Sequence, residues 1–544
     1  MSQVDPSPPP TAPQPRRRVW IRRIGITLLV FFVLVGVRVA WIGILLARGG
    51  KPPKLARETT YVTGPLRSDG AIDYLASLNA KMSEGVTPEN NAARPLMQVL
   101  AYLQCDAAMD QESARRAKNE GCDRLLTALG VPPLPPEDRL RSIYLFLDAD
   151  QRRRADEQKP GEWNCWDEES AAQNAPWTAA VLPIAYRSIQ ANEAALDRVV
   201  AASRLSRYHI PRYTTTSDGM LIAMLLPDVQ HMRDAARRLV SRGMLRLAEG
   251  KPAAASEDFL ACHRLGRLMA QEPTIICWMV GTIMDQIAMS GDSALAHYGN
   301  LSRQQLADYR RRLAELPPMP TLQSKLPGER MMALDGATAV LMGRADFSSI
   351  SDGDSAQGSV FMRLFDANES LQVVNAAYDD LEKAWTLPTF AERKEASSQV
   401  VRDWQTRTSA TRTAGHLFRR ATLGSQAQAS RDLALLIVSL FIPANDACIA
   451  HDAQHHYRQM LRDVTLELAQ YRAAHGGYPP SLDDLKSLAI ATAPSDLLVD
   501  APLTYQRTEK GYVLRAPYVF HPANIENDGV KVEMPIPPLP KREL

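Results

Sequence analysis

The chain has 544 residues, of which 45% are hydrophobic and 23% are charged, the ordinary balance of a globular protein. The formal net charge is only +2, which gives no electrostatic reason to expect a nucleic-acid partner. The length allows roughly two to four domains. A nucleophile elbow, a phosphate-binding loop and a GxGxxG turn are all missing from the sequence, so no catalytic residue, cofactor or small-molecule substrate is identified.

The N-terminal segment predicts a membrane helix. Residues 1–20 are rich in proline and arginine and predict a disordered cytoplasmic tail. Residues 21–47 contain an apolar run, Ile24–Ala47, long enough to cross the ~30 Å hydrocarbon layer. The basic residues before this run are Arg16, Arg17, Arg18, Arg22 and Arg23. Because the more basic flank stays in the cytoplasm, we expect a single-pass protein of a bacterial cytoplasmic membrane, with its N-terminus inside and the bulk of the chain outside.

Two features of this segment leave alternatives open. The residues around Arg38 and Ala47 lack the small-x-small pattern of a signal-peptidase site, which favours a permanent anchor over a cleaved signal. Arg38 lies within the apolar run, where a charge costs roughly 2.5–3.5 kcal/mol at mid-bilayer. It either contacts a partner helix or an acidic lipid, or it reaches the outer interface from a span that ends near Val37.

All six cysteines follow the membrane segment, in a compartment that permits disulfides. Cys105 and Cys122 flank a polar segment and are the candidates for a bridge, which would contribute about 3 kcal/mol. Cys262 and Cys277 lie in apolar helical contexts, where buried free thiols are as compatible with the sequence as a bridge. Six cysteines allow fifteen pairings, so the pattern does not choose among them.

Residues 55–425 predict a helical extracytoplasmic array of αα-hairpins. The clearest unit is Met232–Met269, in which two apolar helical stripes are separated by a short turn. Gly250 is suited to end the first helix and Pro252 to start the second. The spacing of small residues in this unit resembles that of tetratricopeptide hairpins, but the unit is not repeated at a fixed period.

Local signals mark further boundaries. Thr87 and Pro88 predict a helix start. Ser302 and Gln305 form a capping box before another helix. Asp352-Gly-Asp354 lies in a polar loop without the other ligands of a calcium site, which favours a solvated loop.

The helical middle also resembles a group of uncharacterised bacterial membrane-anchored proteins. The segments that carry this resemblance are Tyr61–Leu66, Gly85–Asn91 and Leu260–Leu265. The resemblance implies an architecture and no activity.

The C-terminal block, residues 426–530, predicts a small α+β module. A buried helix at Leu433–Ile442 precedes a long helical pattern that continues to Arg472. Aromatic and β-branched residues then frame a tight turn within 503–515, which indicates a β-hairpin. Residues 531–544 are rich in proline and are expected to form a tail.

This order of elements resembles the soluble half of type IV pilin-like proteins, especially the major pseudopilin of type II secretion. The resemblance is carried by Tyr471-Arg472, Gly477-Tyr478-Pro479, Ser481–Leu485, the Leu503–Arg515 hairpin and Asn527-Asp528-Gly529. It implies a shared module fold. The block is internal here, lacks the processed glycine and early glutamate of pilins, and has too few acids to carry over a calcium site.

His451 and His455 are the candidate metal ligands. Their spacing of four places both imidazoles on one helix face, with Asp452 or Asp446 nearby, and zinc accepts such a pair with a third ligand. No glutamate completes an HExxH arrangement, and histidines are also common as simple polar residues on helices.

The sequence therefore predicts a mainly α protein with an N-terminal transmembrane helix, a helical extracytoplasmic array and a small pseudopilin-like module. The favoured function is a non-enzymatic, membrane-anchored scaffold that binds protein or peptide partners, as helical arrays commonly do. The alternatives are an accessory component of a pilus or secretion apparatus, and a metal-dependent hydrolase centred on the two histidines.

Overall fold

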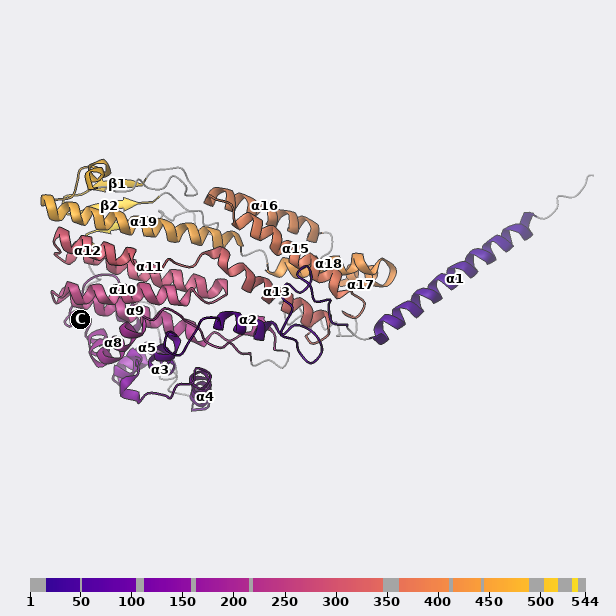
Figure 1. The fold of residues 1–544 in the computed structure, drawn as a ribbon, viewed down its shortest axis with the longest axis horizontal. Helices are drawn as coiled ribbons and strands as arrows, with labels where there is room; N and C mark the ends of the chain where they lie inside the picture. The colour runs from indigo at the N-terminus through magenta and orange to yellow at the C-terminus, as the bar shows by residue number, and fades with distance from the viewer. Residues whose placement is uncertain are drawn as a thin grey trace, which may run out of the picture.

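The structure, a computed structural model, is mainly helical with one small antiparallel sheet (Figure 1). It describes residues 16–48, 51–103, 112–157, 163–214, 219–345, 362–409, 414–441, 445–488, 503–516 and 531–536. The α-helices are α1 Arg16–Arg48, α2 Tyr74–Ser83, α3 Ala93–Leu100, α4 Glu112–Ala128, α5 Ala149–Glu157, α6 Cys165–Ala171, α7 Pro183–Ala191, α8 Glu193–Ala202, α9 Pro227–Ala248, α10 Pro252–Met269, α11 Ile275–Tyr298, α12 Arg303–Ala314, α13 Leu326–Leu341, α15 Ala367–Trp385, α16 Phe390–Ser409, α17 Ala414–Leu423, α18 Gln426–Phe441 and α19 Asn445–His475. The 3₁₀ helices are η1 Pro136–Asp138, η2 Ile143–Phe146, η3 Leu221–Ala223, η4 Leu322–Lys325 and η6 Leu482–Leu488, and the strands are β1 Thr504–Arg507, β2 Tyr512–Arg515 and β3 Lys531–Met534.

Helix α1 extends away from one end of the body (Figure 1). Its segment Ile26–Ala47 has a mean hydropathy of 2.6, and in the described part of the chain it is the one helix long and apolar enough to cross a membrane. Every described side chain from Ile26 to Val37 is exposed. A helix that is apolar on all sides and covered by no other part of the protein is suited to lipid, as an anchor or as a signal segment.

Helices α9, α10, α11 and α19 lie side by side along the body (Figure 1). The predicted hairpin is confirmed, because Gly250 ends α9 with a positive φ of 72° and Pro252 opens α10. Helices α10 and α11 touch through their backbones, since a Cβ on Gly281 would lie 2.5 Å from the Gly266 carbonyl oxygen. The ring of Phe259 fills the space left by two further glycines, one on α9 and one on α11. Small residues therefore set the spacing of the central stack.

A second hydrophobic core lies toward the α1 end of the body. It gathers buried residues of α2, α13, α15, α16, α17 and α18 around Trp385, together with the start of α19. Leu433 and Ile437 are buried there, so the described part of the predicted apolar run, residues 433–441, is a core helix, as expected. Helices α18 and α19 thus belong to the same packed body as the helices that precede them.

The C-terminal sheet has the order β1-β2-β3 and packs on α19 (Figure 1). Thr504 pairs with Arg515 and Arg507 with Tyr512, which confirms the predicted hairpin. Strand β3 occupies residues 531–534, which the sequence assigned to a proline-rich tail, so that assignment is corrected. The error arose because a four-residue strand followed by Pro535 and Pro537 has the composition of a tail, whereas its pairing with β2 exists only in the folded chain.

Other local expectations have mixed outcomes. The capping box at Ser302 and Gln305 is confirmed at the start of α12. The helix start predicted at Thr87 is wrong, because α3 begins only at Ala93 and residues 87–91 form a hydrogen-bonded turn closed by Thr87 and Asn90. The loop with Asp352-Gly-Asp354 and the segment Asn527–Gly529 lie outside the described residues.

Candidate functional site

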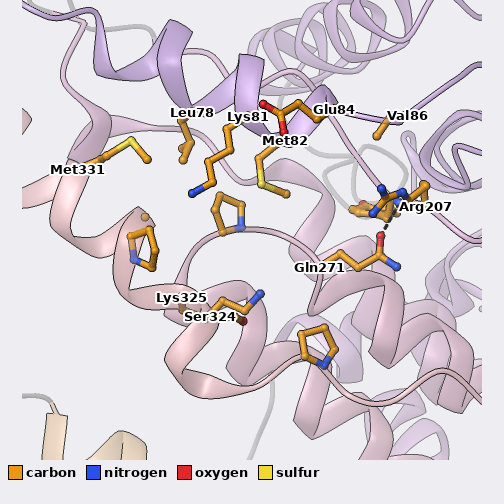
Figure 2. A pocket seen from close by; sticks show the side chains of 15 residues that line it. Leu78, Lys81, Met82, Glu84, Val86, Arg207, Gln271, Ser324, Lys325 and Met331 are labelled. Carbon is orange, nitrogen blue, oxygen red and sulfur yellow. Dashed lines mark hydrogen bonds between the residues drawn. The ribbon is translucent and has the colours of Figure 1, made fainter. Parts of the chain in front are cut away.

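A groove of about 440 Å³ opens between α2, the loop after α10 and the start of α13 (Figure 2). Leu78, Lys81 and Met82 face inward from α2, opposite Ser324 and Lys325 of η4. Three prolines and two methionines make the lining largely apolar. The residues of the lining are Leu78, Lys81, Met82, Glu84, Val86, Arg207, Tyr208, Gln271, Pro273, Pro320, Ser324, Lys325, Pro327, Gly328 and Met331. A concave apolar surface with a few fixed polar groups is the usual form of a ligand site.

The prolines of the lining have structural causes. Pro327 occupies the first turn of α13, where its missing N–H removes no helical hydrogen bond. Gly328 follows it because a Cβ at this position would collide with the carbonyl oxygen of Pro273. The loop after α10 and the start of α13, which both line the groove, therefore touch at this point.

Lys325 is buried in the wall and acts as a helix cap. Its Nζ donates to the carbonyl oxygens of Ala270, at 2.5 Å, and Glu272, at 3.0 Å, at the end of α10. These carbonyls carry the negative end of the helix dipole, so an ammonium group is favourable there. Burial lowers the pKa of Lys325 to about 8.

The rim of the groove carries exposed charges of both signs. Lys81 and Arg207 contribute two cations and Glu84 one anion. The hydroxyl of Ser324 donates to the carbonyl oxygen of Thr321 at 2.5 Å, an arrangement that satisfies the hydroxyl without activating it as a nucleophile. The groove is thus equipped to hold an apolar segment and to favour a negative charge at its edge.

A buried ionic cluster holds the loop that supplies Arg207 and Tyr208 to the groove. The guanidinium of Arg212 donates to Asp228 at 2.5 Å and to Glu272 at 2.9 Å, and Tyr208 donates to Asp228 at 2.7 Å. Burial raises the pKa of Asp228, but Arg212 outweighs this effect and holds that pKa below its usual value. The loop is therefore fixed to the start of α9 by charge-assisted hydrogen bonds.

A second ionic cluster joins α10, α11 and α12 in the middle of the body. His263 Nδ1 lies 2.5 Å from Asp285, and its Nε2 lies 2.9 Å from Asp292. Arg267 donates to Asp285 at 2.6 Å and Tyr309 to Asp292 at 2.5 Å. Burial alone would lower the pKa of His263, but the two carboxylates outweigh it and raise that pKa. Two buried carboxylates are thus balanced by an imidazolium and a guanidinium.

The predicted ligands His451 and His455 share one face of α19, as the spacing implied, and this face packs on α11. His451 Nε2 lies 2.7 Å from the hydroxyl of Thr282, and its ring makes an edge contact with Trp278. His455 Nε2 lies 3.5 Å from Asp285 Oδ2. Burial is the main cause that lowers the pKa of both, that of His455 to about 4, so both rings are neutral at pH 7.

These histidines are not gathered with a third ligand. Asp452, proposed as a neighbour, lies beside His456 at 3.4 Å instead. Across the residues that the structure describes, no three His, Cys, Asp or Glu side chains are placed to hold a metal ion. The histidine pair contributes to helix packing and adds a titratable group beside Asp285.

The predictions for the cysteines have different outcomes. Cys105 lies outside the described residues, so its bridge to Cys122 stays a prediction; Cys122 is buried, and its Sγ lies 2.9 Å from the Ala101 carbonyl oxygen. Cys262 and Cys277 are buried free thiols, one of the two states that the sequence allowed.

The five arginines that the sequence places before the apolar run lie in the first part of helix α1. They are Arg16, Arg17, Arg18, Arg22 and Arg23.

Sequence reasoning missed both ionic clusters and the groove. Asp285 and Asp292 are seven residues apart in an otherwise apolar helix, a spacing that places both on one face. This spacing could have predicted the second ionic cluster, because carboxylates on the apolar face of a helix need buried partners. The groove had no such signal, since its walls come from segments more than 200 residues apart.

Comparison with known protein families, with curated proteins and with solved structures finds no match to this chain.

Proposed function

We propose that this chain is a non-enzymatic, single-pass membrane protein whose extracytoplasmic body binds a protein or peptide partner in the groove between α2 and α13. The observation that carries the proposal is the groove itself, with an apolar, proline-rich lining and a rim of two cations and one anion. Its chemistry suits an extended segment with an apolar side chain next to an acidic one. We place the protein in a bacterial cytoplasmic membrane with its N-terminus inside.

Site-specific photocrosslinking in cells tests the binding role. A photoreactive residue at the exposed rim position Ser324 should form a protein adduct, and one at Gln399 on the exposed face of α16 should not. The double reversal Lys81→Glu with Arg207→Glu should abolish the adduct because it removes both rim cations. The matched double reversal Lys251→Glu with Lys510→Glu, at exposed positions outside the groove, should leave it intact. Equal adducts at Ser324 and Gln399, or an adduct indifferent to rim charge, would overturn the proposal.

The orientation of the chain in the membrane has a separate test. A reporter active only outside the cytoplasm, fused after Leu544, should be active in the full-length chain. A silent reporter in a stably expressed fusion would reverse the assigned topology.

An accessory role in a pilus or secretion apparatus is the second candidate. Its support is the order of a long helix α19, the turn at Gly476-Gly477 and a small antiparallel sheet, which is compatible with a pseudopilin-like module. One face of α19 is covered by α11 and α12, with Arg310 donating to Glu467 at 2.5 Å and to Gln470 at 2.8 Å. A helix covered in this way is not free to pack in a filament, so the module would act within this chain. Recovery of pilus or secretion subunits with the detergent-solubilised chain would favour this role.

The metal-dependent hydrolase is the weakest of the three proposals, because His451 and His455 contact side chains of α11 rather than a shared centre. Elemental analysis of the purified full chain tests it. Stoichiometric zinc that is lost in His451→Ala would revive the hypothesis.

A further inference from the structure

One face of the last part of α1 is covered by the body. Arg38, Trp41, Ile42, Leu45 and Leu46 are the half-buried residues of this helix, and their spacing of three and four defines a single stripe. The last three of them pack against the core around Trp385. The candidate membrane span therefore has an uncovered first part, Ile26–Val37, and a second part that contacts the protein.

Arg38 joins α1 to the C-terminal end of α17. Its Nε donates to the carbonyl oxygen of Thr422 at 2.7 Å and its Nη2 to that of Gly424 at 2.5 Å. The last carbonyls of a helix lack helical partners and carry the negative end of its dipole, so a guanidinium is well suited to them. The partner helix that the sequence left open for Arg38 is thus a helix of the same chain.

The length of the apolar run then places this contact relative to a bilayer. Arg23 is the last charged residue before the run, and the 14 residues Ile24–Val37 rise about 21 Å as a helix. The hydrocarbon layer is about 30 Å thick, so the crossing has to continue past Arg38 for roughly six more residues. Arg38, and with it the end of α17, then lies about 9 Å inside the outer boundary of the hydrocarbon.

The surface at the end of α17 is suited to that position. Leu423 is 76% exposed, the largest exposed fraction among the large apolar side chains of the described residues. Arg419, one turn earlier, is exposed as well. An exposed apolar side chain with an arginine one turn away is a pattern of helices that lie in the membrane interface, with lipid phosphates as partners of the arginine.

We propose that the end of α17 and the turn Leu423–Ser425 insert into the outer leaflet of the membrane that α1 crosses. The body is then held against the membrane surface at a second point, and the groove has a fixed orientation to the bilayer. This inference rests on the membrane-anchor part of the proposed function and is independent of the groove.

Depth-dependent quenching on the full chain in phosphatidylcholine–phosphatidylglycerol vesicles tests the insertion. An environment-sensitive fluorophore is attached through Leu423→Cys or, as a control, through Val181→Cys, another exposed apolar position (44%) whose neighbour Leu182 belongs to the core of α9 and α10 and not to the core that α1 contacts. The labelled parent chain corrects for native thiols. Lipids with a nitroxide near the headgroup should quench the Leu423 probe at least twofold and leave the Val181 probe unaffected, whereas aqueous iodide should do the reverse.

Two outcomes overturn the inference and are distinguishable. If the chain floats with the vesicles but iodide quenches both probes equally, the insertion is wrong and the anchor stands. If the chain does not float, the anchor fails and the insertion fails with it, while the crosslinking result at Ser324 still decides the groove.

Discussion

Helices α1 and α11 are both long and apolar, yet they occupy opposite environments. Between Ile26 and Val37, α1 carries no charge, and none of the described residues of the body covers it. Helix α11 lies in the centre of the body and carries Asp285 and Asp292, both 0% exposed. Each carboxylate has cationic or hydroxyl partners on neighbouring helices. The difference shows that buried charges paired with opposite charges are typical of a core helix, whereas an uncharged and uncovered surface is compatible with a membrane anchor or a signal segment.

Arg38 is also a charged residue with partners on another helix, and it lies where the uncovered part of α1 meets the body. It is the one charged residue between Arg23 and Arg48. It lies where the body first covers α1, and its guanidinium is satisfied by carbonyls of α17. The body therefore supplies hydrogen-bond partners for the one charge in this apolar run, partners that a lipid environment would lack.

The largest expected effect is the loss of a buried counterion in α11. Asp285→Ala leaves His263 and Arg267 as buried cations without their shared carboxylate, and we expect a loss of about 3–5 kcal/mol in the free energy of unfolding. Urea denaturation of the detergent-solubilised chain measures it. The control Asp308→Ala, a half-buried acid on α12, should change this free energy by less than about 0.5 kcal/mol. Equal effects of the two substitutions would show that the ionic cluster does not hold the core.

The pH dependence of stability tests the burial of His455 against α11. The pKa of His455 is lowered to about 4 in the folded chain, against 6.5 for an ordinary histidine. Below pH 6.5 the unfolded chain binds a proton at this histidine and the folded chain does not. The contribution of His455 to the free energy of unfolding is therefore complete above pH 6.5 and is lost as the pH falls toward 4. The maximum loss is about 3 kcal/mol. Melting temperatures at pH 7 and pH 5 should differ less in His455→Gln than in the parent chain, and an unchanged difference would contradict the assignment.

Glycine substitutions compare the two helices directly. Gly281→Ala in α11 places a Cβ 2.5 Å from the Gly266 carbonyl oxygen, and we expect a destabilisation of about 1–3 kcal/mol. Gly36→Ala in α1 meets no atom within 4 Å and should leave both stability and membrane association unchanged. Thermal unfolding and vesicle flotation measure the two properties. A similar loss of stability in both variants would mean that α1 packs against the body more closely than its exposure indicates.

The smallest effect is expected at Arg38. Arg38→Gln removes the cation from the end of α17, a change worth about 1 kcal/mol and confined to that helix. Hydrogen exchange should become faster at the amides of residues 421–424, while the melting temperature of the body stays within about 2 °C of the parent. The substitution Lys51→Gln, at an exposed position after the end of α1, is the control. Unchanged exchange at α17 would remove the structural basis for its insertion into the membrane.

Short-range signals predicted a good part of the fold. The apolar run of α1, the Gly250–Pro252 turn, the capping box at Ser302 and the hairpin of β1 and β2 all depend on residues close in sequence, and all four are present. Thr87 failed as a helix start because Thr87 and Asn90 bond to each other's backbone and close a turn instead. Such a residue can cap a helix or stabilise a turn, and the sequence pattern is the same for both.

The sequence by itself determined that the chain has one lipid-compatible helix near its N-terminus and a helical body, because hydrophobic run length and helical periodicity are local properties. Only the tertiary structure decided what Arg38, His455 and the two aspartates of α11 contact, and where a groove opens. These features join residues tens to hundreds of positions apart, and their energies depend on burial and on partners that exist only after packing. Whether a charged side chain in an apolar helix finds partners therefore depends on the fold and not on the helix that carries it.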